Sequence, residues 1–219
     1  MIYNIRFKIV KRVTNDQDMN ETETPRTAGR PRQFETEAVL DTALDLFWRK
    51  GYRETTTRDL EGALGMGQSS IYNTFGSKQQ LLEAVLDRYE QETTEAVLEP
   101  LRHSEDGLAA IDRFFIALQE WVSSAGHRGC MLTNMMIENS TSAERTGDYR
   151  ERLRGELQTA LQRAADNGEV DPDIDVESRS NLLLGLVLGL NVAARSASSR
   201  DEISSIVDAI RAEVLGWRQ

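Results

Sequence analysis

The stretch Thr55–Lys78, TTTRDLEGALGMGQSSIYNTFGSK, predicts two short helices joined by a tight glycine turn. The first helix can begin at Thr56, because its hydroxyl can accept a hydrogen bond from the amide of Asp59 while the Asp59 carboxylate reaches back, as in a capping box. Gly65 suits the left-handed backbone position that commonly ends a helix. A second helix then follows from Gln68.

The second helix, Gln68–Phe75, offers little to a core. Ile71 and Phe75 are its apolar side chains, four residues apart on one face. Short amides, hydroxyls and a tyrosine are left on the outside: Gln68, Ser69, Ser70, Tyr72, Asn73 and Thr74. Such side chains suit base edges and phosphate oxygens in a DNA major groove, which is wide enough to admit a helix. The alternative is a polar surface helix-turn-helix with no role in DNA binding.

The flanks of this stretch carry a resemblance to a known family. GRPRQF at Gly29–Phe34, ALDLFWRKGY at Ala43–Tyr52 and the Thr55–Lys78 stretch resemble, in order and spacing, the amino-terminal module of the tetracycline-repressor (TetR) family. RGCMLTN at Arg128–Asn134 and RAADNGEV at Arg163–Val170 are similar to pieces of the regulatory domain of one large subgroup. The joint match from Gly29 to Lys78 is far more specific than a helix-turn-helix alone.

The resemblance implies an all-α homodimer that binds a palindromic DNA operator and releases it when a small-molecule inducer binds. The role that it implies is that of a repressor. The alternatives are an activator on the same fold and a helical ligand- or partner-binding protein of little DNA affinity. By the same resemblance Gln68, Ser70 and Asn73 would contact base edges. The residues that it places at phosphates are Thr56, Ser69, Tyr72 and Lys78, with Arg30 and Arg32 in support.

Three segments are expected: a disordered extension over residues 1–28, a DNA-binding domain over 29–76 and a helical ligand-binding and dimerisation domain over 77–219. Beyond the two short helices, the apolar pattern predicts helices at about Thr36–Lys50, Ser77–Val97, Asp106–Ser124, Cys130–Asn139, Asp148–Asn167, Val176–Ala197 and Asp201–Trp217.

The amino-terminal extension has no apolar periodicity after Val13, and Met19 is a plausible alternative start of translation. Next to it, Arg30 and Arg32 flank Pro31 in a short basic arm that we expect to be non-helical because of the proline. Arms of this kind lie along phosphates or enter a minor groove. The alternative is a solvated charge cluster.

The net charge of −10 is unevenly divided along the 219 residues. Residues 26–80 hold 8 Lys or Arg against 7 Asp or Glu, giving +1, whereas residues 81–219 hold 14 against 25, giving −11. The asymmetry suggests that the amino-terminal module meets the polyanion while the rest of the chain is held away by its own repulsion.

The second domain contains a candidate ligand site. A broad apolar face on the Asp106–Ser124 helix and three methionines of the next helix could line an adaptable cavity, since thioethers fit irregular apolar shapes. The residues are Phe114, Phe115, Leu118, Trp121, Met131, Met135 and Met136. Without the resemblance, the same residues would be interpreted as plain core.

The last two helices carry the predicted dimer interface, because in the family they pair with their copies in a four-helix bundle. Gly185 and Gly189 share one helix face and would permit close approach of another helix, and an apolar stripe follows on the last helix. The interface residues are Gly185, Gly189, Ile203, Ile206, Val207, Ile210 and Val214. The alternative for this set is core within one chain.

Other chemistry has little support. His103 and His127 lack metal-ligand spacing, and we find no phosphate-binding glycine loop and no nucleophile elbow, so no metal, cofactor or enzymatic activity is expected. Cys130 is the one cysteine, interpreted as a small core residue, and this excludes an intrachain disulfide and fits a reducing cytoplasm. The longest apolar run, Leu182–Leu190, is far shorter than the roughly 20 residues of a membrane span.

Overall fold

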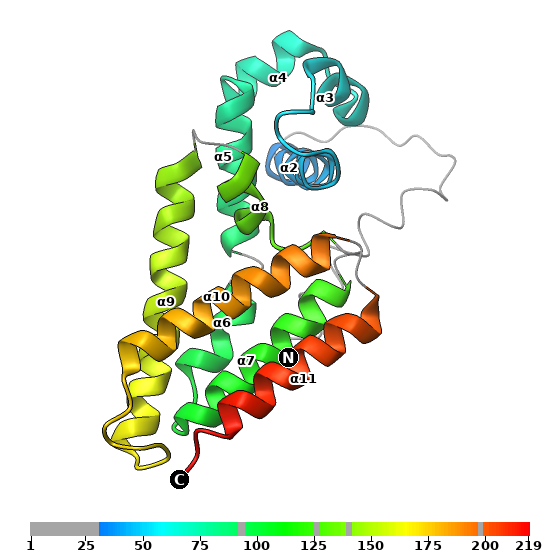
Figure 1. Ribbon diagram of the computed structural model, residues 1–219. Helices are drawn as coiled ribbons and strands as arrows, with labels where there is room; N and C mark the ends of the chain where they lie inside the picture. The colour runs from blue at the N-terminus through cyan, green and yellow to red at the C-terminus, as the bar shows by residue number, and fades with distance from the viewer. Residues whose placement is uncertain (1–30, 92–94, 125–127, 139–141, 197–198) are drawn as a thin grey trace. The chain divides into compact units, whose positions relative to one another are not determined.

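The computed structural model describes residues 31–91, 95–124, 128–138, 142–196 and 199–219. The all-α prediction is confirmed: these ranges contain no strand, only an isolated antiparallel bridge between Val170 and Arg218. The helices (Figure 1) are α2 (Pro31–Lys50), α3 (Thr57–Leu64), α4 (Gln68–Phe75), α5 (Lys78–Tyr89), α6 (Glu95–Arg102), α7 (Gly107–Ser124), α8 (Met131–Glu138), α9 (Ala143–Asp166), α10 (Val176–Arg195) and α11 (Arg200–Leu215).

The chain divides into two compact units, with residues up to Thr93 in the first and residues from Thr94 in the second. This division falls after α5, whereas the boundary expected from the sequence falls before it. The reason is that α5 packs along α2 within the first unit.

The core of the first unit is built from one apolar stripe on each helix. Phe47 of α2, Leu60 of α3 and Ile71 of α4 are fully buried together with Leu81 and Leu82 of α5. Burying one large aliphatic side chain contributes roughly 1.5–3 kcal/mol. Each short helix of the helix-turn-helix is therefore anchored mainly by a single side chain, which leaves its other faces available for other contacts.

Two segments of the first unit and its flank differ from the sequence prediction. The helix α2 starts at Pro31, five residues before the expected start, because proline has no amide hydrogen to lose at the first helical position. The helix predicted to run to Val97 ends as α5 at Tyr89, and a separate helix α6 contains Pro100, which was expected to mark a helix end. Residues 1–30, including Met19 and Arg30, lie outside the described residues.

The second unit is organised around α7, against which α6, α9 and α11 pack, while α10 packs on α9 and α11. Its core includes Leu108, Ile111 and Val122 of α7, all fully buried. Cys130 is buried, as expected for a core residue. Among the described helices, none combines the length and the apolar content that crossing a bilayer requires.

Candidate nucleic-acid interface

The turn between α3 and α4 has the backbone geometry that its glycines predict. Gly65 has φ of 62° and ψ of 23°, the left-handed conformation that ends α3. Gly67 then has an extended backbone and stands as the N-cap of α4, where no side chain of its own can accept a hydrogen bond from the helix amides. The helix-turn-helix therefore has a strong stop for its first helix and a weak local start for its second.

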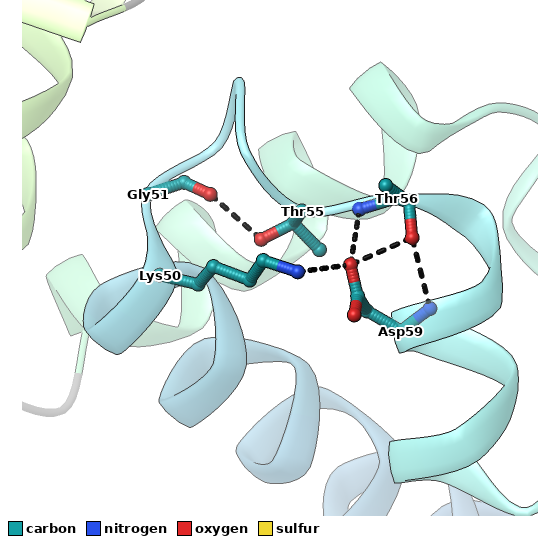
Figure 2. Close-up of polar contacts among 5 residues, drawn as sticks. All are labelled: Lys50, Gly51, Thr55, Thr56 and Asp59. Carbon is teal, nitrogen blue, oxygen red and sulfur yellow. Dashed lines mark hydrogen bonds and ion pairs between the residues drawn. The ribbon is translucent and has the colours of Figure 1, made fainter.

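The amino terminus of α3 is closed by the capping box that the sequence predicts (Figure 2). The Thr56 hydroxyl accepts from the Asp59 amide at 3.2 Å, and the Thr56 amide donates to Asp59 Oδ2 at 2.7 Å. The hydroxyl also donates to Asp59 Oδ2, at 2.6 Å. The single hydroxyl hydrogen of Thr56 is thus used inside the capping box, so a bond donated by this group to a phosphate would replace the one to Asp59.

The same carboxylate ties α3 to the end of α2. Lys50 Nζ lies 2.5 Å from Asp59 Oδ2 (Figure 2), and Thr55 Oγ1 donates to the Gly51 carbonyl at 2.6 Å in the connecting turn. The Lys50 ammonium, followed by the two bonds from Thr56, holds the pKa of Asp59 well below its usual value of 3.8. Asp59 is therefore an anion at any physiological pH. Its carboxylate connects the end of α2 to the start of α3.

The outward surface of α4 matches the sequence interpretation of its polar side chains. Ile71 is fully buried and Phe75 is half-buried, which turns the opposite side of the helix to solvent. The exposed residues of that side are Gln68, Ser69, Ser70, Asn73 and Thr74. They present amide and hydroxyl groups over the length of a helix that carries no charged side chain.

Tyr72 differs from its neighbours on α4 because it is half-buried. Its phenol oxygen lies 3.1 Å from the Thr57 hydroxyl oxygen, and either atom can donate. The ring therefore bridges α4 to the first turn of α3. Tyr72 has a structural partner in addition to the phosphate contact that the resemblance implies.

Lys78 stands at the first position of α5, after the N-cap Ser77, whose hydroxyl accepts from the Gln80 amide at 3.1 Å. Its ammonium lies 4.3 Å from the centre of the Tyr52 ring, within the range of a cation–π contact. Partial burial lowers the pKa of Lys78, while the charges of Asp59 and Glu54 oppose that shift. The ring thus holds the ammonium beside the amino terminus of a helix.

The basic arm is only partly described. Arg32 belongs to the first turn of α2, so the expectation of a non-helical arm through Pro31 is wrong. Proline is disfavoured in helix interiors, but Pro31 occupies the first position, where its fixed φ suits a helix. The side chain of Arg32 and the whole of Arg30 lie outside the described residues.

One residue near the interface was missed in the sequence. Glu61 of α3 accepts a hydrogen bond from the backbone amide of Gln68, the first residue of α4, with an N–Oε1 distance of 2.8 Å. The signal that could have revealed it is the absence of a capping side chain at Gly67. A helix start without a local cap requires an acceptor from elsewhere.

The seven predicted ligand-binding residues lie in α7 and α8 of the second unit. All are buried except Met136, which is half-buried, and Phe114 and Phe115 pack edge to face with their ring centres 5.3 Å apart. The remaining members are Leu118, Trp121, Met131 and Met135. Their packing is compatible with the core interpretation as well as with the wall of a ligand site, so the ligand assignment stays a prediction.

The predicted dimer residues separate into two groups. Ile203, Val207, Ile210 and Val214 are buried inside the chain by its own packing, as in the alternative interpretation, and offer no surface to a second copy. Ile206 is half-buried, and Gly185 and Gly189 are exposed on α10. The apolar stripe of α11 is buried within the chain because α7 packs on α11.

A metal centre has no support in the described ranges, where His, Cys, Asp and Glu side chains nowhere form a group of three or more placed to hold an ion.

Two family descriptions match the chain: "Bacterial regulatory proteins, tetR family" over residues 39–85, and "Tetracyclin repressor-like, C-terminal domain" over residues 107–210. The first match covers the helix-turn-helix and its flanks, and the second lies within the second unit.

Similar proteins are transcriptional regulators. The HTH-type transcriptional repressor ComR of Escherichia coli is 30% identical over 191 residues, covering 83% of this chain and 89% of its own length. The structure of a cysteine mutant of the TetR family regulator CifR, complexed with a 26-bp operator duplex, aligns with a TM-score of 0.71 over 86% of this chain and 98% of its own, at 21% identity. AibR, in complex with isovaleryl coenzyme A and operator DNA, aligns with a TM-score of 0.67 over 82% and 97%, at 19% identity.

Proposed function

Because the chain belongs to the TetR family of transcriptional regulators, a family of non-enzymes, we propose that it is a repressor acting on DNA in the cytoplasm. It binds a palindromic operator as a homodimer through α4 and leaves the operator when a small-molecule inducer binds to the second unit. The observation that carries this proposal is the solvent side of α4, where five uncharged hydrogen-bonding side chains surround a single buried anchor.

The chemistry of α4 supports base contacts. Gln68 and Asn73 are exposed, and a side-chain amide can make the bidentate contact with adenine that hydroxyls cannot make. Ser70 adds a group that can donate or accept. We assign these three residues to base edges and Ser69, Tyr72 and Lys78 to phosphates.

Electrostatics support the same orientation of the chain. Residues 26–80 carry +1 and residues 81–219 carry −11, so the acidic part is repelled by DNA and the amino-terminal module is not. Lys78 adds a cation at a helix amino terminus, where backbone amides already favour an anion. DNA binding therefore relies on a few individually placed cations, because residues 26–80 as a whole carry almost no net charge.

The outer surface of α10 supports the homodimer. Leu182 and Val192 are 42% and 49% exposed, and they share one face of the helix with the exposed Gly185 and Gly189. Large apolar side chains beside glycines suit the close approach of a second helix. A two-fold pair of chains then requires an operator of two inverted half-sites, whose spacing is set by the separation of the two α4 helices.

The methionine-rich α8 and the aromatic face of α7 are our candidates for the inducer site, and AibR, solved with an acyl coenzyme A, illustrates a ligand in a protein of the same fold. Release of the operator requires that the inducer bind the non-binding conformation more tightly, because equal affinity for both conformations shifts nothing. Binding in the second unit would then act by changing the separation of the two α4 helices.

The test is a titration of the purified protein into a labelled duplex from the region upstream of its gene, at physiological salt, beside a scrambled duplex. The variant Gln68→Ala, Asn73→Ala removes two exposed amides of α4, and Thr159→Ala, Gln162→Ala removes two exposed polar side chains of α9 as a matched control. We expect saturable, sequence-specific binding that only the α4 variant loses, by about 1–3 kcal/mol for each bidentate contact.

The other outcomes separate the alternatives. Weak binding that ignores sequence and disappears as salt rises would reject the operator role at that promoter and favour a partner-binding protein. Specific binding that raises transcription from the promoter would make the protein an activator. Titration of small molecules into the specific complex would then identify the inducer by release.

A further inference from the structure

We infer that Glu61 is a positioning residue for α4: its carboxylate caps the recognition helix from the neighbouring helix, in place of the side chain that Gly67 lacks. The contact is the bond from the Gln68 amide to Glu61 Oε1 at 2.8 Å. Gly67 has φ of −70° and ψ of 153°, an N-cap backbone without a side-chain bond. The inference rests on the proposed operator binding by α4 and assigns to Glu61 the placement of the side chains that read the bases.

The need for such a cap follows from the start of α4. The first amides of a helix have no partner within the helix, and a serine, threonine, asparagine or aspartate at the N-cap ordinarily supplies one. At Gly67 this source is absent. A carboxylate is a stronger acceptor than a hydroxyl, because its bond to the amide is charge-assisted. Its negative charge also interacts favourably with the positive end of the helix dipole.

The position of Glu61 gives the bond a second effect. Glu61 is part of α3, and the bond spans the turn that contains Gly65 and Gly67, two residues with unusual backbone freedom. Closing this turn restricts the angle between α3 and α4. Farther along α4, the bond between Tyr72 and Thr57 joins the same two helices.

The two ties act around the buried anchor Ile71. One lies at the first residue of α4 and the other one turn later, and both reach back to α3. The exposed amides and hydroxyls of α4 point away from this attachment. Their orientation toward a groove therefore depends on both ties, because one buried side chain alone leaves rotation of a short helix weakly restrained.

A purely solvated Glu61 would behave in the opposite way. An anion beside a DNA-binding helix repels phosphates, so removing its charge would strengthen binding to any duplex. A positioning Glu61 has a different effect, since its loss lowers affinity for the operator while leaving affinity for scrambled DNA equal or higher. The ratio of the two affinities distinguishes the roles.

The experiment compares wild type, Glu61→Ala, Glu61→Gln, Gly67→Ser and Glu61→Ala/Gly67→Ser. A side chain at residue 67 has room, because a Cβ there meets nothing within 4 Å. Glu54→Ala is the matched control, since it removes an exposed carboxylate of the same unit that caps no helix. Fluorescence anisotropy gives the affinity for the operator and the scrambled duplex, and amide hydrogen exchange of α4 in the free protein gives a readout without DNA.

We expect Glu61→Ala to speed exchange of the first amides of α4 and to lower the ratio of operator to scrambled affinity, each by about 2- to 30-fold, the range of a lost helix cap. Glu61→Gln should fall between this variant and wild type. Gly67→Ser should restore both quantities in the Glu61→Ala background and change them little in wild type. Glu54→Ala should leave exchange in α4 unchanged.

Two results would overturn the inference: unchanged exchange in Glu61→Ala, or an equal gain from Gly67→Ser in both backgrounds. A failure of the proposed function gives another pattern, in which exchange responds as expected but no variant, wild type included, prefers any operator. In that case Glu61 caps α4 without positioning it for bases, and the positioning role is rejected together with operator binding. The Glu61→Gln variant, which keeps the side-chain volume, serves if Glu61→Ala fails to fold.

Discussion

The phenol oxygen of Tyr72 lies 3.1 Å from the hydroxyl oxygen of Thr57, so the second helix of the helix-turn-helix is hydrogen-bonded to the first turn of the helix before it. Tyrosine has a single hydroxyl hydrogen. If Tyr72 donates it to a phosphate, Thr57 must become the donor to Tyr72, which the geometry permits because either atom can donate. The pair can therefore connect the two helices while the Tyr72 hydroxyl donates a hydrogen bond to a DNA phosphate.

The first prediction separates these two uses with a double-mutant cycle. Tyr72→Phe and Thr57→Val each remove the bond, and we expect each to destabilise the first unit by about 0.5–1.5 kcal/mol. If the phenol also contacts phosphate, Tyr72→Phe lowers operator affinity further in the Thr57→Val background. Equal affinities of the Thr57→Val single variant and the double variant would limit Tyr72 to the link between helices.

The second prediction concerns acid. The pKa of Asp59 is lowered by Lys50 first and by Thr56 next, so the folded state binds the Asp59 proton more weakly than the unfolded state does. The stabilisation is fully present above the ordinary value of 3.8 and is lost as the pH falls below about 4, through the lowered pKa. We expect Lys50→Met to move the pKa of Asp59 back toward its ordinary value, measured by NMR titration.

The matching stability measurement uses Asp59→Asn. This variant should be less stable than wild type at pH 7, and the difference should shrink as the pH is lowered through the acid range, because wild type alone loses the carboxylate interaction. Glu54→Gln, at an exposed residue of the same unit, is the control for a simple loss of charge. A constant difference between Asp59→Asn and wild type across that range would contradict the assignment.

The third prediction concerns the ion pair that joins α5 to α2. Arg88 Nε lies 2.8 Å from Asp41 Oδ1, with the side chains only 14% and 11% exposed. Arg88→Ala leaves the Asp41 carboxylate largely buried without this partner, and we expect a loss of about 3 kcal/mol, the lower end for breaking a buried pair. Hydrogen exchange of α2 and α5 across a urea series provides the measurement.

The control for this pair lies on α2, the helix that contains Asp41. Arg49 and Asp45 also form an ion pair at 2.8 Å, but the Arg49 side chain is 58% exposed. Arg49→Ala should therefore cost no more than about 0.5 kcal/mol. Similar losses for Arg49→Ala and Arg88→Ala would show that burial is not what gives the Arg88 pair its value.

Features encoded over a few residues were predictable from the sequence. The capping box joins Thr56 to Asp59, three positions along the chain, and the left-handed Gly65 follows from the turn that it must make. The polar surface of α4 follows from its spacing around Ile71. In each case the local sequence contains both the group and its partner, so no knowledge of the tertiary structure is required.

Contacts between distant residues were not predictable in this way. Arg88 and Asp41 are 47 residues apart, and the apolar pattern of the Ser77–Val97 segment continues across the end of α5, which hides the break before α6. The bond from Gln68 to Glu61 depends on the path of the turn. An apolar stripe shows that a helix is covered but not by what, which is why Ile203 and Val207 turn out to belong to the core of their own chain.

The fourth prediction concerns the proposed dimer face of α10. A Cβ at Gly189 meets no atom within 4 Å, so Gly189→Arg fits the single chain and adds a charge only where a second copy would pack. We expect the variant to fold, to run as a monomer in light scattering after size exclusion, and to lose operator affinity because a monomer engages one half-site. Gly155→Arg is the matched control, since it replaces a glycine of α9 that also has open space around its Cβ.

The choice between α10 and α11 as the main contact can be made with the same assay. The exposed side of α11 includes the small residues Ser205, Ala209 and Ala212, whereas Ile203, Val207, Ile210 and Val214 are buried in the chain. A stable interface needs about 1,200–2,000 Å² of buried surface, which one helix face alone does not supply, so α11 must add its small-residue side to the face of α10. Ala209→Arg should then weaken the dimer as Gly189→Arg does. A dimer that survives both substitutions, with Gly155→Arg unchanged, would place the interface on another surface and remove the argument for operator spacing that depends on it.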